Sequence, residues 1–245
     1  MKEYVKTLIV CVSVVICVLI FSANLISFKT AQNNYITVTG SATKSFTSDL
    51  IVWRGSFSKE AKTSKDAYDQ LKNNAFAVKS YLIKNNINEN EIIFSSIRIQ
   101  ENYHHEYNYE GRLTNTIFTG YTLTQSVKIE SNDVDKIEQI SRDITELIDL
   151  GVEFLSMAPE YYYTKLDELK LNLIVEATEN SRIRAETIAK EAGAKITKLK
   201  SANLGVFQII AENSPPDSYS SGGAFDIFSK NKTAFITTKL EYLLK

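Results

Sequence analysis

The sequence is poor in the residues that build disulfides, metal sites and tight turns. Its 245 residues include 2 Cys, 2 His, 3 Pro and 9 Gly, and 28 Lys+Arg stand against 29 Asp+Glu. A net charge of -1 supplies no basic field for nucleic acid, and so few histidines and cysteines disfavour a soft-metal site. The scarcity of glycine and proline predicts long regular elements. With 44% hydrophobic residues the chain can bury a core, which excludes a disordered protein.

The N-terminus carries a long uncharged apolar run. Residues 7–28 contain no charged side chain, and as a helix they would span about 33 Å, enough for the core of a bilayer. Lys2 and Lys6 precede the run and Lys29 follows it, so the positive-inside tendency places residues 1–6 in the cytoplasm. The sequence therefore predicts a single-pass protein of the inner (cytoplasmic) membrane, with its C-terminal domain periplasmic or extracellular.

Cleavage of this run as a signal peptide is the alternative, and it would release a soluble periplasmic protein. Phe21 stands where a signal peptidase prefers a small residue before the best candidate cut, after Ala23, so retention as an anchor is favoured. Cys11 and Cys17 both lie within the run. The exported body consequently has no thiol, and its stability must come from packing.

The pattern of apolar residues after residue 34 predicts an α+β domain over residues 35–245. Capping residues and helical spacing predict helices from Thr63 to Asn85, from Asp133 to Gly151 and from Leu166 to Ala192, the last of them capped by Thr164. The inner face of this last helix turns to small residues, which permit close packing. The order is about ββαββαβαββ, with antiparallel sheet and helices packed on one face. We expect the first two strands to pair as a ribbon across residues 41–49. Alternation predicts strands at 35–40, 50–57, 93–99, 117–129, 152–163, 198–212 and 234–242.

The most chemical-looking cluster lies between the strands predicted at 93–99 and 117–129. Residues 101–115 form a polar, tyrosine-rich stretch that we interpret as the ragged tip of a long hairpin. Adjacent histidines on an extended strand point to opposite faces and do not readily share one metal ion. A solvated tip or a subunit contact is therefore favoured over a metal site. The candidate interface residues are Tyr103, His104, His105, Tyr107 and Tyr109.

Other candidate sites are weaker. Tyr161, Tyr162 and Tyr163 could stack on sugars, but packing in a strand is favoured because tyrosine has a high β propensity. The run Ser220-Ser221-Gly222-Gly223 lacks both the strand–turn–helix setting of a nucleophilic serine and the Lys-Ser/Thr ending of a phosphate loop. We therefore assign no catalytic residue, no cofactor and no metal ligand.

The order and spacing of several short motifs along residues 35–245 resemble the SIMPL-domain family, of the periplasmic immunogenic protein and oxidative-stress defence protein type. This chain has Ser48-Asp49 where the family commonly has Pro-Asp. The resemblance implies an exported bacterial α+β domain, assembled into rings in some members, with no established catalytic mechanism. The motifs are Val38-x-Gly40, Asp49, Thr63 with Ala67, Asn86-Ile87 with Ile92, Gly120-Tyr121, Gly151-Val152, and Ala177, Ala185, Ala189 and Ala192-Gly193.

These observations lead to one main hypothesis and two alternatives. The main hypothesis is a non-catalytic envelope protein, anchored through residues 7–28, that self-assembles and has an envelope partner of unknown identity; the resemblance adds a role in envelope or oxidative-stress tolerance. The first alternative is an extracytoplasmic module that binds glycan or peptide with the hairpin tyrosines. The second is a metal-dependent hydrolase that uses residues 101–110. No nucleic-acid partner is expected.

Overall fold

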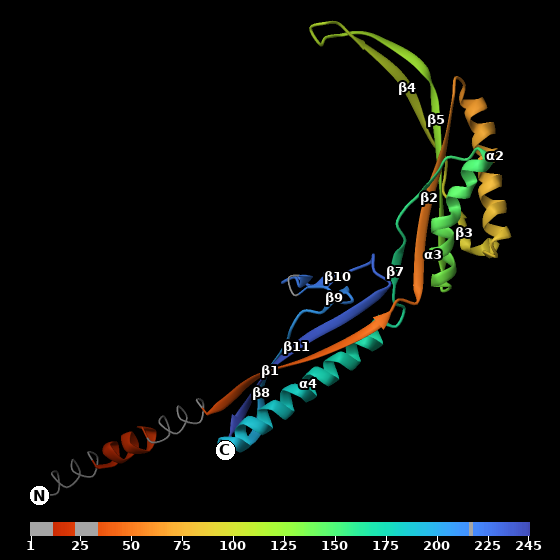
Figure 1. The fold of residues 1–245 in the computed structure, drawn as a ribbon. Coiled ribbons are helices and arrows are strands. Elements are labelled where there is room, and N and C mark those ends of the chain that lie inside the picture. The colour runs from red at the N-terminus through yellow and green to blue at the C-terminus, as the bar shows by residue number, and fades with distance from the viewer. Residues whose placement is uncertain (1–11, 23–33, 216–217) are drawn as a thin grey trace, which may run out of the picture.

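The computed structural model describes residues 12–22, 34–215 and 218–245. These residues form an elongated molecule in which helices lie against two sheets, as Figure 1 shows. We call them the upper sheet and the lower sheet, as they lie in Figure 1. The α+β class predicted from the sequence is confirmed, and nearly all strand pairs are antiparallel, although β9 and β10 run parallel.

The upper sheet has the strand order β3-β5-β2-β6, with β4 also paired to β5 and β7 to β2. Helices α2 and α3 and the 3-10 helix η2 cover one face of it, and we call the other face the open face. Its elements are β2 (Leu50–Ala61), α2 (Ser64–Lys84), η1 (Glu89–Glu91), β3 (Ile92–Phe94), β4 (Arg98–Tyr107), β5 (Leu113–Ser131), α3 (Val134–Asp143), η2 (Ile144–Leu150), β6 (Phe154–Ser156) and β7 (Glu160–Tyr162).

The core of the upper sheet follows from strict alternation along its strands. Trp53 and Phe57 of β2 and Leu123 of β5 are buried, and they meet the buried stripe of α2 that includes Leu71 and Leu82. Large aromatic side chains fill this space, and the rings of Trp53 and Phe154 lie 5.7 Å apart. Each such residue contributes about 2 to 5 kcal/mol, judged by the cost of truncating it.

The predicted helix caps of this sheet are present. Asp66 donates its backbone N–H to Thr63 Oγ1 at 3.1 Å, and Lys136 donates its N–H to Asp133 Oδ1 at 3.3 Å. These bonds satisfy backbone donors that the first turn of a helix leaves unpaired. Gly151 ends η2 in the left-handed conformation, at a φ of 75°, as the sequence predicted.

The lower sheet has the strand order β1-β11-β9-β10, with β8 also paired to β11. Helix α4 packs on one face with small residues, among them the buried Ala177 and Ser181. A Cβ at Gly40 would lie 2.3 Å from Ser181 Oγ, so the close approach of α4 to β1 requires glycine. The elements are β1 (Tyr35–Thr47), α4 (Leu166–Glu191), β8 (Ile196–Leu204), β9 (Gln208–Ala211), β10 (Ala224–Phe225) and β11 (Asn231–Leu244).

The predicted ribbon between the first two strands is wrong. β1 pairs with β11 and β2 pairs with β5, so the chain changes sheets at Ser48–Asp49. The inward face of β1 carries the small residues that suit α4, whereas β2 turns Trp53 and Phe57 into the other core. A ribbon of β1 and β2 would have placed both strands in one sheet, although their buried side chains belong to two different cores.

Two further predictions need correction. Thr164 does not cap α4, whose N-cap residue is Lys165; instead the N–H and hydroxyl of Thr164 each donate to the Asp49 carboxylate at 2.7 Å. Thr164 therefore helps to join the two sheets. The single strand predicted at 198–212 is divided into β8 and β9, with a break around Gly205.

The predicted membrane segment is described only in its centre. Residues 12–22 are helical, and the rest of the run at 7–28 lies outside the described residues. None of the helices in the described ranges combines the length and the apolar character needed to cross a bilayer.

Candidate functional site: an exposed β-finger

The strand β4 and the first residues of β5 continue past the N-terminal end of α2 as a two-stranded ribbon that no helix covers (Figure 1). We call residues 98–119 the finger. Its turn is held by Asn108, whose side-chain oxygen accepts from the N–H groups of Glu110 and Arg112 at 3.0 and 2.9 Å. The ragged tip predicted at 101–115 was too long, because both strands remain paired as far as Tyr107 and Leu113.

The register divides the finger into two chemically different faces. Cross-strand partners share a face, and Tyr103 lies opposite Phe118 while His104 lies opposite Ile117. One face is largely polar, with Ile117 as an apolar exception. The other face, which we call the apolar face, continues the helix-covered face of the sheet, because Ile99 pairs with Leu123. The apolar face carries Ile99, Tyr103, Tyr107, Leu113 and Phe118, interspersed with the polar residues Glu101, His105 and Thr116.

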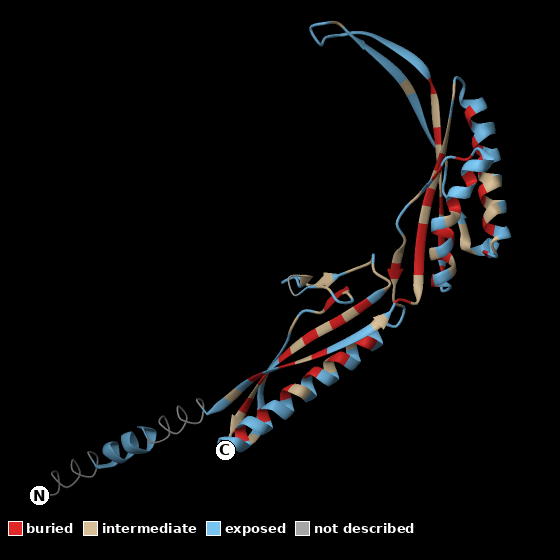
Figure 2. Ribbon diagram, viewed as in Figure 1, coloured by how far each residue is buried: buried red, intermediate tan, exposed pale blue. Residues whose placement is uncertain are grey.

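The apolar face is exposed (Figure 2). The exposed fractions are 48% for Tyr103, 62% for Tyr107, 55% for Leu113 and 45% for Phe118. Tyr109 at the turn is 98% exposed. An alternating apolar face without a cover is unusual in a folded protein.

The aromatic rings of the apolar face contact one another, which restricts their orientations. The rings of Tyr103 and Phe118 lie 5.7 Å apart, and those of Phe118 and Tyr121 lie 5.1 Å apart, both edge to face. Tyr103 also donates its hydroxyl to Glu101 at 2.5 Å. The Glu101 carboxylate raises the pKa of Tyr103 by this hydrogen bond and by its charge. The rings therefore form a preorganised surface.

The two histidines lie on opposite faces of the finger, as strand alternation predicts. His104 pairs with Ile117 on the polar face, and His105 lies on the apolar face with its Nδ1 3.1 Å from Thr116 Oγ1. Within the described ranges, no group of three His, Cys, Asp or Glu side chains is placed to hold a metal ion.

The remaining candidate residues have structural roles. Tyr161 is buried, Tyr162 donates its hydroxyl to Glu160 at 2.8 Å, and the Tyr163 ring lies 4.9 Å from that of Phe46. Strand packing, the interpretation that the sequence favoured, is confirmed for Tyr161 and Tyr162 in β7, whereas Tyr163 lies just beyond the strand. Ser220 lies in a loop tied to Gln208, whose side-chain amide bonds the N–H and carbonyl of Ser220 at 3.1 and 2.7 Å.

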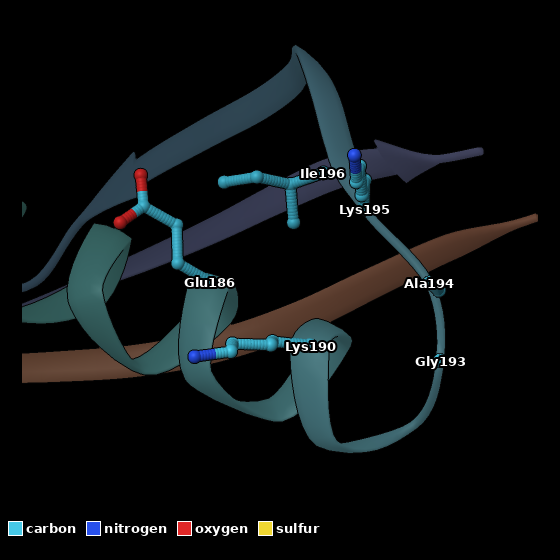
Figure 3. Close-up of a pocket in the computed structure, with 6 residues that line it drawn as sticks. All are labelled: Glu186, Lys190, Gly193, Ala194, Lys195 and Ile196. Atoms are coloured by element: carbon cyan, nitrogen blue, oxygen red, sulfur yellow. The ribbon is translucent and has the colours of Figure 1, made fainter.

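A hollow of about 550 Å³ lies where α4 ends and β8 begins. Glu186 of α4 and Ile196 of β8 extend toward the space between helix and strand (Figure 3). The Glu186 carboxylate already accepts from Arg182 at 2.7 Å. The charged groups here are those of an ordinary helix surface, and the sequence had not marked this place.

These features define an α+β protein of two sheets that presents an amphipathic, solvent-exposed β-finger. Residues 36–235 match the model of the SIMPL family, described as a protein of unknown function (DUF541). The chain therefore belongs to the SIMPL family, as its motifs predicted. No curated protein matches the chain.

Proposed function

We propose that this protein is a non-catalytic envelope protein, anchored by residues 7–28, whose exported SIMPL domain self-assembles through the finger. The observation that carries the proposal is the uncovered apolar face of the finger. A two-stranded ribbon alone is at best marginally stable in water, so a ribbon of this length is best explained by a partner surface that covers it.

A second copy of the chain is the partner that this face suits. Tyrosine and phenylalanine are enriched in protein interfaces because they bury a large, rigid area. Both tyrosines of the apolar face keep a polar end, which tolerates water in the free subunit. In a symmetric dimer the same patch of each chain contacts that of the other, so one self-complementary surface is sufficient for association.

Glycan or peptide binding by the same tyrosines has less support. A ligand pocket needs walls on several sides, whereas Tyr103 and Tyr107 stand on a two-stranded ribbon with exposed neighbours. An exposed ribbon with apolar side chains on one face favours contact with another protein surface.

The assembly is tested with the full-length protein in a non-ionic detergent, by sedimentation over a range of concentrations. We expect the double substitution Tyr107→Ser/Leu113→Ser to shift the oligomer to monomer. The matched control is Ile117→Ser, which removes an apolar side chain of the polar face that is 42% exposed, and it should leave the oligomer intact. The proposal would be contradicted if the wild-type protein were monomeric at every concentration. It would also be contradicted if the double variant and Ile117→Ser changed the oligomeric state equally.

The anchor and the physiological role have separate tests. Fractionation of cells should place the intact chain in the membrane fraction, and its presence in the soluble fraction would count against the anchor. The stress role rests on family resemblance and predicts that a strain lacking the gene is more sensitive to peroxide than the wild type. Unchanged sensitivity would argue against that role and leave the assembly untouched.

A further inference from the structure

The open face of the upper sheet contains a polar hollow of about 460 Å³ at the base of the finger, on the side opposite the apolar face. Its lining residues come from β2, β5, the start of β4 and the link between β3 and β4. They alternate along the strands with core residues such as Phe57 and Leu123, so they face away from the helices. The main contributors are the hydroxyls of Ser56, Ser96, Thr124 and Ser126, the amide of Gln100 and the guanidinium of Arg98.

A β-bulge shapes this hollow. β3 and β4 both pair with β5, but Phe94 lies opposite Val127 and Arg98 opposite Thr124, so one strand holds an extra residue between these pairs. Ser95 secures the bulge: it donates its N–H to Ser126 O at 2.9 Å, and its Oγ accepts from Ser126 N–H at 3.0 Å. Bulges of this kind re-aim side chains next to functional sites.

Arg98 is the distinctive member of the hollow. The other cations of the open face are paired, Arg54 with Glu160 at 2.8 Å and Lys128 with Glu130 at 3.0 Å. Across the described part of the chain, Arg98 has no carboxylate within ion-pair distance, and no acidic residue lines the hollow.

Glu60 also lies on the open face, outside the lining of the hollow. It shares a row of the sheet with Thr122 and Gln100, which on this face is the next row after Arg98 in the direction of the finger turn. Its carboxylate accepts from the Asn102 side-chain amide at 2.9 Å. The Glu60 carboxylate keeps its negative charge but does not line the hollow, whose described lining has Arg98 as its one charged side chain among neutral polar groups.

We propose that this hollow binds a phosphate group. A guanidinium donates two parallel hydrogen bonds to an oxyanion, and serine and threonine hydroxyls can donate to its remaining oxygens. A planar carboxylate would use the guanidinium alone, whereas a tetrahedral anion would also engage the hydroxyls on β2, on β5 and on the link between β3 and β4. The volume leaves space beyond a single phosphate, so the group is either free phosphate or the phosphate of an ester.

The test is an amide chemical-shift titration of the 15N-labelled full-length protein in non-ionic detergent, at constant ionic strength. The probes are inorganic phosphate, glycerol 3-phosphate and acetate. We expect saturable shifts at residues 95–98 and 124–126 with phosphate, at a Kd in the millimolar range, and at least tenfold weaker binding of acetate. Tighter binding of glycerol 3-phosphate would support an ester as the ligand, and equal binding would support recognition of the free anion.

Two variants make the test specific. Arg98→Gln should weaken phosphate binding at least tenfold, and Thr124→Val should weaken it by a smaller factor. The matched control is Arg112→Gln, which removes the same charge from a finger-turn side chain that is 81% exposed, and it should bind as the wild type does. No saturable shift with either phosphate probe, acetate binding as tight as phosphate, or an unchanged Kd in Arg98→Gln would overturn the proposal. The amide spectrum of each variant also reports whether it has folded.

Discussion

The two halves of β5 differ in everything that surrounds them, and a register shift at Thr119 separates the alternation of one half from that of the other. From Tyr121 to Ser131 the strand pairs with β2 and lies under α2, and Leu123 and Val127 are 1% and 0% exposed. From Leu113 to Thr119 it pairs with β4 alone, and Leu113 and Phe118 are 55% and 45% exposed. Alternation therefore identifies the two faces within each half, but it shows neither the register shift between the halves nor whether another element covers the apolar face.

The largest expected effect comes from removing a leucine in each half. Leu123→Ala should lower the free energy of unfolding by about 2 to 5 kcal/mol, because it leaves a cavity in the core. Leu113→Ala should change it by less than about 0.5 kcal/mol, since an exposed side chain loses little in the monomer. Denaturant unfolding of the full-length variants, at a concentration where the protein is monomeric, measures both. Equal losses would show that the finger is covered within one chain.

Gly120, at the border between the halves, should give the next largest effect. Its φ is 148°, and a Cβ there would lie 2.4 Å from the carbonyl oxygen of Ala61. Gly120→Ala should therefore cost about 1 to 3 kcal/mol of global stability through backbone strain and this contact.

The control for this border position is Gly111→Ala in the finger turn. Gly111 also has a positive φ, 75°, but nothing lies within 4 Å of its would-be Cβ. The strain it introduces is about 1 to 2 kcal/mol and falls on the exposed turn, which can open without unfolding the core. If Gly120→Ala and Gly111→Ala lowered the free energy of unfolding equally, the close contact at Gly120 would not be a special requirement of the fold.

Local signals in the sequence were sufficient where the structure depends on neighbours along the chain. The caps Thr63 and Asp133, the stop at Gly151 and the small-residue stripe of α4 were all predicted correctly because each acts within a few residues. The pairing of β1 was missed because its partner, β11, lies near the other end of the chain. Its inward side chains suit α4, a fact that only the assembled core reveals.

The candidate sites also differ in whether neighbouring residues in the sequence were enough to predict them. The finger tyrosines and histidines were recognisable from composition, and alternation placed His104 and His105 on opposite faces. The hollow around Arg98 was not recognisable, because its residues come from separate strands and its shape depends on a bulge in the register with β5. The one local cue was Ser95-Ser96, which interrupts the apolar alternation of the predicted strand.

The smallest expected effect compares an ion pair of each region as the pH falls. On the open face of the upper sheet, hydrogen bonds from Arg54 and then Tyr162 lower the pKa of Glu160, whereas Glu110 and Arg112 lie 3.7 Å apart at the finger turn. A folded-state pKa below the unfolded value of about 4.3 means that the unfolded chain binds more protons in acid. The stabilisation by Glu160 is thus present above about pH 5 and is lost as the pH falls through the folded pKa.

Because the Arg54 side chain is 43% exposed, this stabilisation should be below about 1 kcal/mol. Unfolding of the wild type and Glu160→Gln, measured at pH 7 and pH 3, should show a small deficit in the variant at pH 7 that shrinks at pH 3. Glu110→Gln, the matched change in the finger, should show no deficit at either pH, because its partner is exposed and solvated. A deficit in Glu160→Gln that grew in acid would mean that Glu160 is protonated in the folded protein and stabilises it as a neutral donor, which would reverse the role assigned to Arg54.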